Sequence, residues 1–220
     1  MCGRYTIYTS PKKFAEYFSA TLTFEFGKSY NIAPTTSIPV VIRADDERFI
    51  VPMRWGLIPS WHKEGRKFSL LNNAKIETVD IKPSFRLPFT RKRCLIIANG
   101  FYEWDPTVKP KQPYYYHLKN DGPIAIAGIW DNWISPEGLL SSCCIITTPA
   151  NQIVSKVHNR MPGIISPDQY DTWLDPELNN ATKLKEIITA SPEPNSLISF
   201  PVSTKVNKAA FDDESCIRPI

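Results

Sequence analysis

The sequence predicts an α+β fold, with a strand-rich, mostly antiparallel and barrel-like core and peripheral helices. Several short apolar or aromatic runs are separated by proline, glycine and asparagine, whereas helical patterns are few and short. The 20 prolines among 220 residues are spread along the whole chain, which is typical of many turns and strand ends. At this length we expect one domain over residues 1–220.

The first element along the chain is a helix that begins at Ser10-Pro11. Serine caps helix N-termini, and proline fits the first helical position. Phe14, Tyr17 and Phe18 follow at helical spacing, so we expect all three on one face of the helix.

Strand signals dominate the rest of the sequence. Residues 37–55 predict a hairpin, because two apolar runs flank the turn residues Asp45 and Asp46. Weaker helical patterns predict short helices at residues 168–174 and 181–190. We expect further strands, consecutive and mostly antiparallel, at residues 94–104, 113–118, 123–130, 139–148 and 196–203.

Composition excludes several classes of protein. Hydrophobic residues make up 42% of the chain, which argues against disorder. No apolar run approaches the ~20 residues that cross a bilayer, and the start of the chain has no signal-peptide pattern, so we expect a cytoplasmic protein with no membrane contact. The 26 Lys and Arg against 22 Asp and Glu leave a net charge of +4, which permits nucleic acid as a partner.

The cysteine and histidine content gives no metal signature. The five cysteines have no C-x-x-C spacing, and the three histidines are isolated from one another. We therefore expect free thiols, no metal and no cofactor. Cys94, Cys143 and Cys144 fall in predicted strands, where free cysteine packs as a small hydrophobe.

Cys2 carries the most informative chemistry in the sequence. Removal of the initiator methionine would leave Cys2 with a free α-amine and a thiol on adjacent carbons. The amine can condense with an aldehyde to an imine, and the thiol can then close a five-membered thiazolidine ring. Ring closure is intramolecular and gains the effective concentration of a positioned nucleophile. If Met1 is retained, the Cys2 nitrogen is an amide and cannot react in this way.

Other interpretations of Cys2 stand beside this one. A cysteine at position 2 is most often incidental. The same terminus could instead serve an amidohydrolase, with the thiol attacking an amide and the amine acting as base. Lipid attachment has less support, because no lipoprotein signal precedes the cysteine.

Six motifs occur in an order that resembles the SOS response-associated peptidase (SRAP) family, the abasic-site processing proteins. This resemblance implies that Cys2 bonds covalently to abasic sites in single-stranded DNA and shields them, after the protein has removed its own residue 1. It also implies a DNA-associated protein, and we expect a monomer. The motifs are MCGRY (1–5), YNIAP (30–34), RWGLIPSW (54–61), NNAKIET (72–78), RCLIIANGFYEW (93–104) and HNRMPGII (158–165).

Glu103 in the GFYEW motif is the candidate acid-base residue. Burial among the neighbouring aromatic residues Phe101, Tyr102 and Trp104 would raise its pKa and suit it to proton transfer. An isolated glutamate is more often an exposed carboxylate in a hairpin. The resemblance implies the catalytic role, in opening the sugar and forming the imine.

Two further catalytic residues follow from the resemblance. His158 is the second acid-base candidate, since imidazole titrates near neutrality and can donate to a sugar oxygen. Asn73 is placed beside the reacting sugar, although an asparagine is commonly only a helix cap. Arg160 is expected near a phosphate, and Lys75 stands where the family often has arginine, so that it lacks the two-pronged fork.

DNA contacts are less sharply located than the chemistry. The resemblance implies that they come from Gly3, Arg4, Asn31, Trp61, Lys75, Trp104, Thr147 and Arg160. Two basic clusters, Lys63-Arg66-Lys67 and Arg91-Lys92-Arg93, are by default solvated faces, but with an exposed Trp61 they could form a charged groove and a stacking surface. His62 stands where the family has a second aromatic residue.

Three functions therefore compete. The first is covalent capture of abasic sites in single-stranded DNA by Cys2. The second is a peptidase or amidohydrolase acting on other molecules through the same cysteine, and no His/Asp pair in a hydrolase motif supports it. The third is a non-covalent single-strand-binding module, which has no need of a cysteine at position 2.

Overall fold

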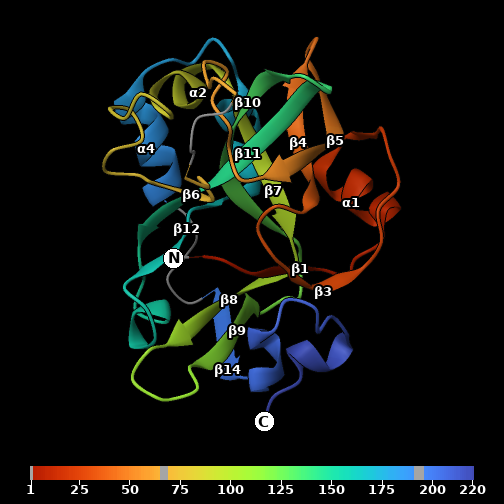
Figure 1. Cartoon of the computed structure of the whole chain (residues 1–220), viewed down its shortest axis with the longest axis vertical. Helices are drawn as coiled ribbons and strands as arrows, with labels where there is room; N and C mark the ends of the chain where they lie inside the picture. Colours follow the sequence, from red (N-terminus) through yellow and green to blue (C-terminus); the bar gives the residue numbers. More distant parts are fainter. Residues whose placement is uncertain (1, 65–68, 191–195) are drawn as a thin grey trace.

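The computed structural model describes residues 2–64, 69–190 and 196–220 and consists of two sheets (Figure 1). The smaller sheet has the strand order β14-β9-β8-β1-β3 and is antiparallel throughout. It lies at the C-terminal end of the molecule in Figure 1. Its strands are β1 (Tyr5–Ile7), β3 (Ser29–Ile32), β8 (Gly100–Asp105), β9 (Gln112–Leu118) and β14 (Leu197–Pro201).

The larger sheet closes into a five-stranded barrel. Its ring runs β10-β7-β4-β5-β11 and back to β10, and the closing β5–β11 pair is parallel, with Cys143 opposite Trp55. A closed ring leaves no open edge on these strands. They are β4 (Ser37–Ala44), β5 (Glu47–Trp55), β7 (Arg93–Ala98), β10 (Ile124–Ser135) and β11 (Gly138–Pro149).

Four short strands extend the barrel. β6 and β12 both pair with β11, β13 pairs with β10, and β2 pairs with β5. The predicted α+β class with a barrel-like core is confirmed, although the pairs β5–β11, β6–β11 and β2–β5 are parallel. The added strands are β2 (Thr21–Leu22), β6 (Asn73–Lys75), β12 (Arg160–Pro162) and β13 (Ile164–Ile165).

Short helices lie around the strands, as predicted. The Ser10 side chain caps the first helix by accepting a hydrogen bond from the Lys13 N–H. Phe14 and Phe18 are buried, whereas Tyr17 is 42% exposed. Tyr17 lies at the rim of the buried face, edge-on to Phe18. The helices are α1 (Pro11–Phe18), α2 (Arg86–Arg91), α3 (Tyr170–Leu174) and α4 (Ala181–Thr189), with 3-10 turns η1 (Val154–Lys156), η2 (Pro167–Gln169), η3 (Thr204–Asn207) and η4 (Glu214–Ile217).

The predicted hairpin is confirmed as β4 and β5. Its turn residues Asp45 and Asp46 both have positive φ, 48° and 63°. Aspartate tolerates this left-handed conformation, and a turn with positive φ at both central residues has a backbone twist that matches the twist of the flanking strands.

The predicted strand at residues 94–104 is wrong in one respect, because it is two strands in two sheets. β7 ends at Ala98 and pairs with β4 and β10, whereas β8 starts at Gly100 and pairs with β1 and β9. A Cβ at Gly100 would lie 2.4 Å from the Tyr116 carbonyl oxygen, so only glycine fits this close crossing. The Asn99 side chain accepts from the N–H groups of Tyr8 and Thr9 and fixes the bend.

The core fills the barrel and reaches into the smaller sheet. All five cysteines are buried free thiols, and Cys94, Cys143 and Cys144 lie on core strands as predicted. Arg93 is also buried, and its guanidinium donates to carbonyls of Phe89, Trp173 and Asp175. The expectation that Arg93 belongs to a solvated basic face is therefore wrong.

Two features are absent from the described ranges. None of their helices combines the length and apolar character needed to cross a bilayer. No group of three or more histidine, cysteine, aspartate or glutamate side chains there could hold a metal ion.

Candidate functional site

The start of the chain is held between the barrel and the smaller sheet. Asn73 on β6 donates a hydrogen bond of 2.9 Å from its side chain to the Cys2 carbonyl oxygen. The Arg4 carbonyl accepts one of 3.0 Å from the Tyr102 N–H on β8. Residues 2–4 therefore bridge β6 and β8 before entering β1 (Figure 1).

The Cys2 thiol is fully buried. Its Sγ lies 3.9 Å from the Arg4 carbonyl oxygen. Burial, and then the nearby negative charge of Glu103, raise the pKa of the Cys2 thiol far above its ordinary value. The sulfur is therefore protonated at neutral pH, and thiolate chemistry needs a group that takes its proton.

Asn73 reaches Cys2 from a strand and not from a helix cap. β6 runs parallel to β11, with Asn73 opposite Ile145. The Asn73 Oδ1 is buried and has no hydrogen-bond partner within the described ranges. A buried amide oxygen without a partner costs free energy, so this atom is available to a hydroxyl or amine donor.

Glu103 is almost completely buried on β8. The alternation of the strand places it on the face of Phe101, which stacks on Tyr116 at 5.1 Å. Tyr102 lies on the opposite face and donates to the Tyr30 carbonyl, so the expectation that Tyr102 helps to bury Glu103 is wrong. Burial raises the pKa of Glu103 to about 7, the direction predicted from the sequence.

His158 faces Glu103 across the site. Its Nδ1 lies 3.0 Å from the Arg160 main-chain N, 3.2 Å from the Arg160 carbonyl oxygen and 3.9 Å from Glu103 Oε2. When Nδ1 accepts from the Arg160 N–H, the neutral ring carries its proton on Nε2. Burial lowers the pKa of His158, so the ring is uncharged at neutral pH.

A cleft of about 530 Å³ opens onto these two groups. Trp104 forms part of its wall and donates from Nε1 to Asn207 Oδ1 at 2.6 Å. A larger hollow of about 840 Å³ lies beside α1 and is lined by none of the predicted site residues. The cleft is lined by Arg4, Glu103, Trp104, Pro106, Lys111, His158 and Asn207.

Arg4 and Asn31 form one structural unit behind the cleft. Arg4 donates to the Asn31 side-chain oxygen at 2.8 Å and to the Val206 carbonyl at 3.0 Å. The Asn31 amide nitrogen is directed to main-chain carbonyls of residues 206, 208 and 211. Asn31 is buried, so its direct role in this structure is to hold Arg4 and the C-terminal segment. Gly3 is half-buried beside them.

A second group of predicted residues gathers on β6, β11 and β12. Lys75 is exposed and lies opposite the buried Thr147. The Arg160 guanidinium donates to the Thr147 carbonyl at 2.6 Å and to both carboxylate oxygens of Glu77, at 2.5 and 3.1 Å. Arg160 therefore already has an anionic partner, and a phosphate would have to compete with Glu77 for it.

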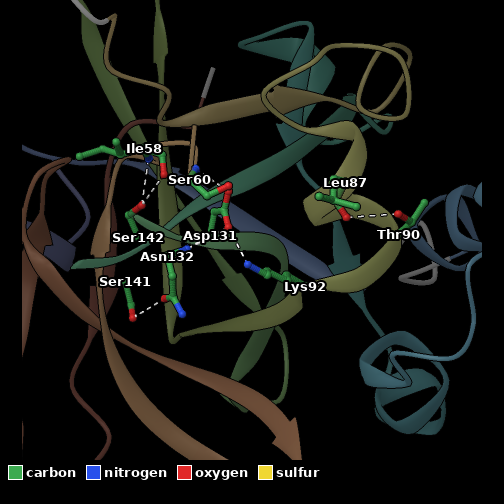
Figure 2. A network of polar contacts seen from close by, with 9 residues as sticks. All are labelled: Ile58, Ser60, Leu87, Thr90, Lys92, Asp131, Asn132, Ser141 and Ser142. Atoms are coloured by element: carbon green, nitrogen blue, oxygen red, sulfur yellow. Dashed lines mark hydrogen bonds and ion pairs between the residues drawn. The ribbon is translucent and has the colours of Figure 1, made fainter. Parts of the chain in front are cut away.

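Trp61 lies outside the cleft, on a loop fixed to the barrel. Its side chain is 59% exposed. Ser142 Oγ accepts from the Ile58 N–H at 2.9 Å, and Asp131 accepts from the Ser60 N–H and from Lys92 Nζ, each at 2.7 Å (Figure 2). Of the basic cluster after Trp61, Arg66 and Lys67 lie outside the described residues.

The His62 side of this loop has its own aromatic partner. Trp133 of β10 donates to the His62 carbonyl at 2.9 Å, and the two rings lie 5.4 Å apart. His62 therefore packs against a tryptophan from another strand, which no local sequence signal predicts.

Glu77, Lys111 and Asn207 lie close to the predicted site residues and were not themselves predicted from the sequence. Glu77 belongs to the NNAKIET motif, and its place two residues after Lys75 is the local signal that points to it. Lys111 and Asn207 carry no local signal, because only the folded chain brings residues 104, 111 and 207 to one cleft.

Glu103 and His158 can transfer protons close to the Cys2 thiol, the candidate nucleophile. Glu103 titrates near neutrality, His158 offers a neutral donor, and Asn73 fixes the Cys2 main chain. A carboxyl with a pKa near the working pH is suited to general acid-base catalysis.

The chain is similar to several known proteins over most of its length. A family model described as "SOS response associated peptidase (SRAP)" matches residues 1–209. The chain is 36% identical over 214 residues to the abasic site processing protein YoqW of Bacillus subtilis, with 94% of each chain covered. It is 34% identical over 227 residues to the abasic site processing protein HMCES of Gallus gallus, covering 87% of this chain and 66% of that protein. A crystal structure of a protein from Bacteroides thetaiotaomicron shares the fold over 100% of both chains, with a TM-score of 0.87 and 24% identity.

Proposed function

The chain belongs to the SOS response-associated peptidase family, and we propose that it is an abasic-site processing protein that bonds covalently to abasic sites in single-stranded DNA through Cys2. The observation that supports this most is the grouping at the start of the chain. Asn73 holds the Cys2 carbonyl at 2.9 Å, and Glu103, whose charge acts on the Cys2 thiol, lies 3.9 Å from His158.

The first step in this proposal is removal of residue 1. Hydrolysis of the Met1–Cys2 peptide bond adds the hydroxyl of one water to the Met1 carbonyl carbon and its proton to the Cys2 nitrogen. The product is a free α-amine, with an ordinary pKa of about 7.7–8.0 and thus a useful neutral fraction near pH 7.5. Glu103 is the proton carrier that we assign to a self-catalysed cleavage.

The second step is imine formation. An abasic sugar must open from its hemiacetal ring to an aldehyde, which needs a proton delivered to the ring oxygen. His158 Nε2–H and Glu103 supply donors for this proton. The Cys2 amine then attacks the aldehyde carbon and expels its oxygen as one water.

Ring closure makes the bond stable. The Cys2 sulfur attacks the imine carbon, its proton passes to the Glu103 carboxylate, and the imine nitrogen takes up a proton. The new S–C bond completes a thiazolidine ring of nitrogen, Cα, Cβ, sulfur and the former aldehyde carbon. A buried, protonated thiol cannot attack without an acceptor for its proton, which gives Glu103 a defined task.

DNA would contact the cleft and the loop that carries Trp61. The exposed Trp61 offers a face on which an unpaired base stacks, worth about 1–3 kcal/mol. Lys75, Arg160, Arg4 and Trp104 remain the proposed contacts to backbone and sugar. Gly3, Asn31 and Thr147, half-buried or buried, would act by shaping the surface that the strand meets.

The proposal is tested with protein that has lost Met1 and single-stranded DNA bearing one abasic site. Wild type should give an adduct that survives denaturation, and Cys2→Ala should give none. Cys2→Ser keeps the amine but not the thiol, so its adduct should survive only after borohydride reduction of the imine. Cys216→Ala removes a distant thiol and is the matched control.

Other outcomes point to the competing functions. A stable adduct with Cys2→Ala would exclude the thiazolidine. Cys2-dependent turnover of a peptide library would favour a peptidase acting on other molecules. Tight binding to intact single strands without any covalent product would favour a non-covalent binding module.

A further inference from the structure

We propose that Glu77 is a positioning residue for this reaction, acting through Arg160 on the imidazole of His158; the inference rests on the proposed function. Glu77 follows β6 in the chain. Both of its carboxylate oxygens accept hydrogen bonds from the Arg160 guanidinium, at 2.5 and 3.1 Å; we call this pair the clamp. Paired parallel contacts of this kind fix orientation as well as distance. The hydrogen bonds from Arg160 lower the pKa of Glu77, so the clamp stays ionised in mild acid.

The same guanidinium is held from a second side by β11. Its Nη2 donates to the Thr147 carbonyl at 2.6 Å and lies 3.2 Å from Thr147 Oγ1. Only 12% of the Arg160 side chain is exposed. The Arg160 side chain therefore connects the segment after β6 to β11, and its guanidinium has little freedom to move.

The clamp lies at the start of β12. Arg160 is the first residue of β12 and lies opposite Pro149 of β11. The nearest hydrogen bond towards the loop runs from the Ala150 N–H to the Asn159 carbonyl. A charged side-chain clamp at this point fixes the start of the strand.

That fixed main chain orients the catalytic histidine. His158 Nδ1 lies 3.0 Å from the Arg160 main-chain N and 3.2 Å from the Arg160 carbonyl oxygen. We assign the shorter contact as the hydrogen bond, so that Nδ1 accepts from the Arg160 N–H and the ring proton is on Nε2. Glu103 Oε2 is 3.9 Å from the same Nδ1. If Arg160 shifts, Nδ1 loses its donor and can take the proton itself, turning a donor away from the cleft and towards Glu103.

One rival role for Glu77 makes the opposite prediction. Its carboxylate occupies the two-pronged face of Arg160 that a phosphate would use. If Glu77 only masks this face, its removal should tighten DNA binding. Positioning is favoured because the main-chain link from Arg160 to His158 connects the clamp to a cleft-lining catalytic candidate.

The test compares Glu77→Gln, Glu77→Asp and Glu214→Gln. Glutamine keeps the shape but loses the charge, aspartate keeps the charge on a shorter stem, and Glu214 forms an exposed ion pair with Arg218 and serves as the matched control. For each protein we would measure the adduct-formation rate at saturating abasic DNA, the half-saturating DNA concentration, the melting temperature and the nitrogen NMR shifts of His158 without DNA.

We expect Glu77→Gln to slow adduct formation about 10- to 100-fold at saturating DNA while the half-saturating concentration stays within about twofold. Its His158 spectrum should lose the single Nε2–H tautomer of wild type. Glu77→Asp should recover part of the rate and of the tautomer, and Glu214→Gln should match wild type.

Two results would overturn the positioning role. Wild-type rate and tautomer with a lower melting temperature would make the pair purely structural, and tighter, faster reaction would make Glu77 a mask on Arg160. If wild type itself forms no adduct, the proposed function fails, but the tautomer measurement needs no DNA and still decides whether Glu77 positions His158.

Discussion

Burial of the ionised Glu103 carboxylate lowers the stability of the folded protein. Its carboxyl is buried on β8, and burial raises its pKa to about 7 from an ordinary 4.5. The folded state therefore holds this proton more tightly than the unfolded state does. The contribution of Glu103 to the free energy of unfolding is then greatest below about pH 4.5, falls as the pH rises towards 7, and is constant above that.

Glu103→Gln should consequently stabilise the protein in alkaline solution. Glutamine has the same shape and no charge to bury, so the gain in unfolding free energy should grow by on the order of 2 kcal/mol between pH 5 and pH 8. Chemical denaturation at the two pH values measures this gain. Glu137→Gln, at an exposed turn, should show no such growth, and an equal effect in both variants would contradict the burial argument.

The same Glu103→Gln variant should be a poor catalyst. If the carboxyl moves protons, adduct formation should slow by roughly 10²–10⁴ with DNA affinity unchanged. Rate at saturating DNA and affinity for an intact single strand separate the two quantities. A parallel loss of affinity would assign Glu103 to the architecture of the cleft instead.

For single residues, the chemical character of a side chain could be predicted from the sequence, but its packing partners could not. The raised pKa of Glu103 follows from its aromatic neighbours, but strand alternation places Tyr102 on the far face. Asn31 and Arg93 are buried polar side chains whose N–H groups donate to main-chain carbonyls. No local pattern predicts that, because their partners come from distant segments.

At the element scale, the loop that carries Trp61 shows how an exposed side chain is fixed. Asp131 accepts from the Ser60 N–H and from Lys92, and it is itself buried (Figure 2). Hydrogen bonds to a buried charge contribute more than neutral ones, so the loop has a defined position on the barrel.

Asp131→Asn should loosen this loop without touching the cleft. We expect a loss of about 1–3 kcal/mol in unfolding free energy, because Lys92 loses its counter-charge and Ser60 a charged acceptor. Affinity for single-stranded DNA should fall, while the adduct rate at saturating DNA is kept. Binding titrations and single-turnover rates test this, and a lower saturating rate would mean that the loop contributes to the chemistry.

The elements also mark where sequence patterns stop being informative. The hairpin β4–β5 and the cap of α1 follow from local residue types and are confirmed. The run at residues 94–104 has continuous strand character, yet it crosses between sheets at Asn99-Gly100. The Asn-Gly pair was a visible signal, but the crossing depends on Tyr115 and Tyr116 of another strand.

For the whole molecule, the barrel is the scaffold on which the site is built. Ring closure depends on the parallel β5–β11 pair, and β6 and β12 attach Asn73 and Arg160 to the same β11. The smaller sheet brings Glu103 from the other side. Parallel closure between strands distant in sequence could not be predicted from runs that looked consecutive and antiparallel.

The charge of the whole chain bears on DNA affinity. The net charge is +4, but Arg160, Lys92 and Arg48 are paired with carboxylates, which leaves fewer cations for phosphates. Binding of intact single strands should therefore weaken with salt, with a slope of about −1 to −3 in log affinity against log salt concentration, as for about 2–4 phosphate contacts. Titrations at several salt concentrations give this slope, and a slope near zero would contradict a phosphate-binding groove.

Intact-mass spectrometry of the wild-type protein, before and after incubation with single-stranded DNA carrying one abasic site, is the decisive test of covalent capture by Cys2. We predict a starting mass that lacks Met1, then a product heavier by the mass of the oligonucleotide less one water, formed without a reducing agent. A chain that has lost Met1 and still shows no added mass would contradict covalent capture by Cys2.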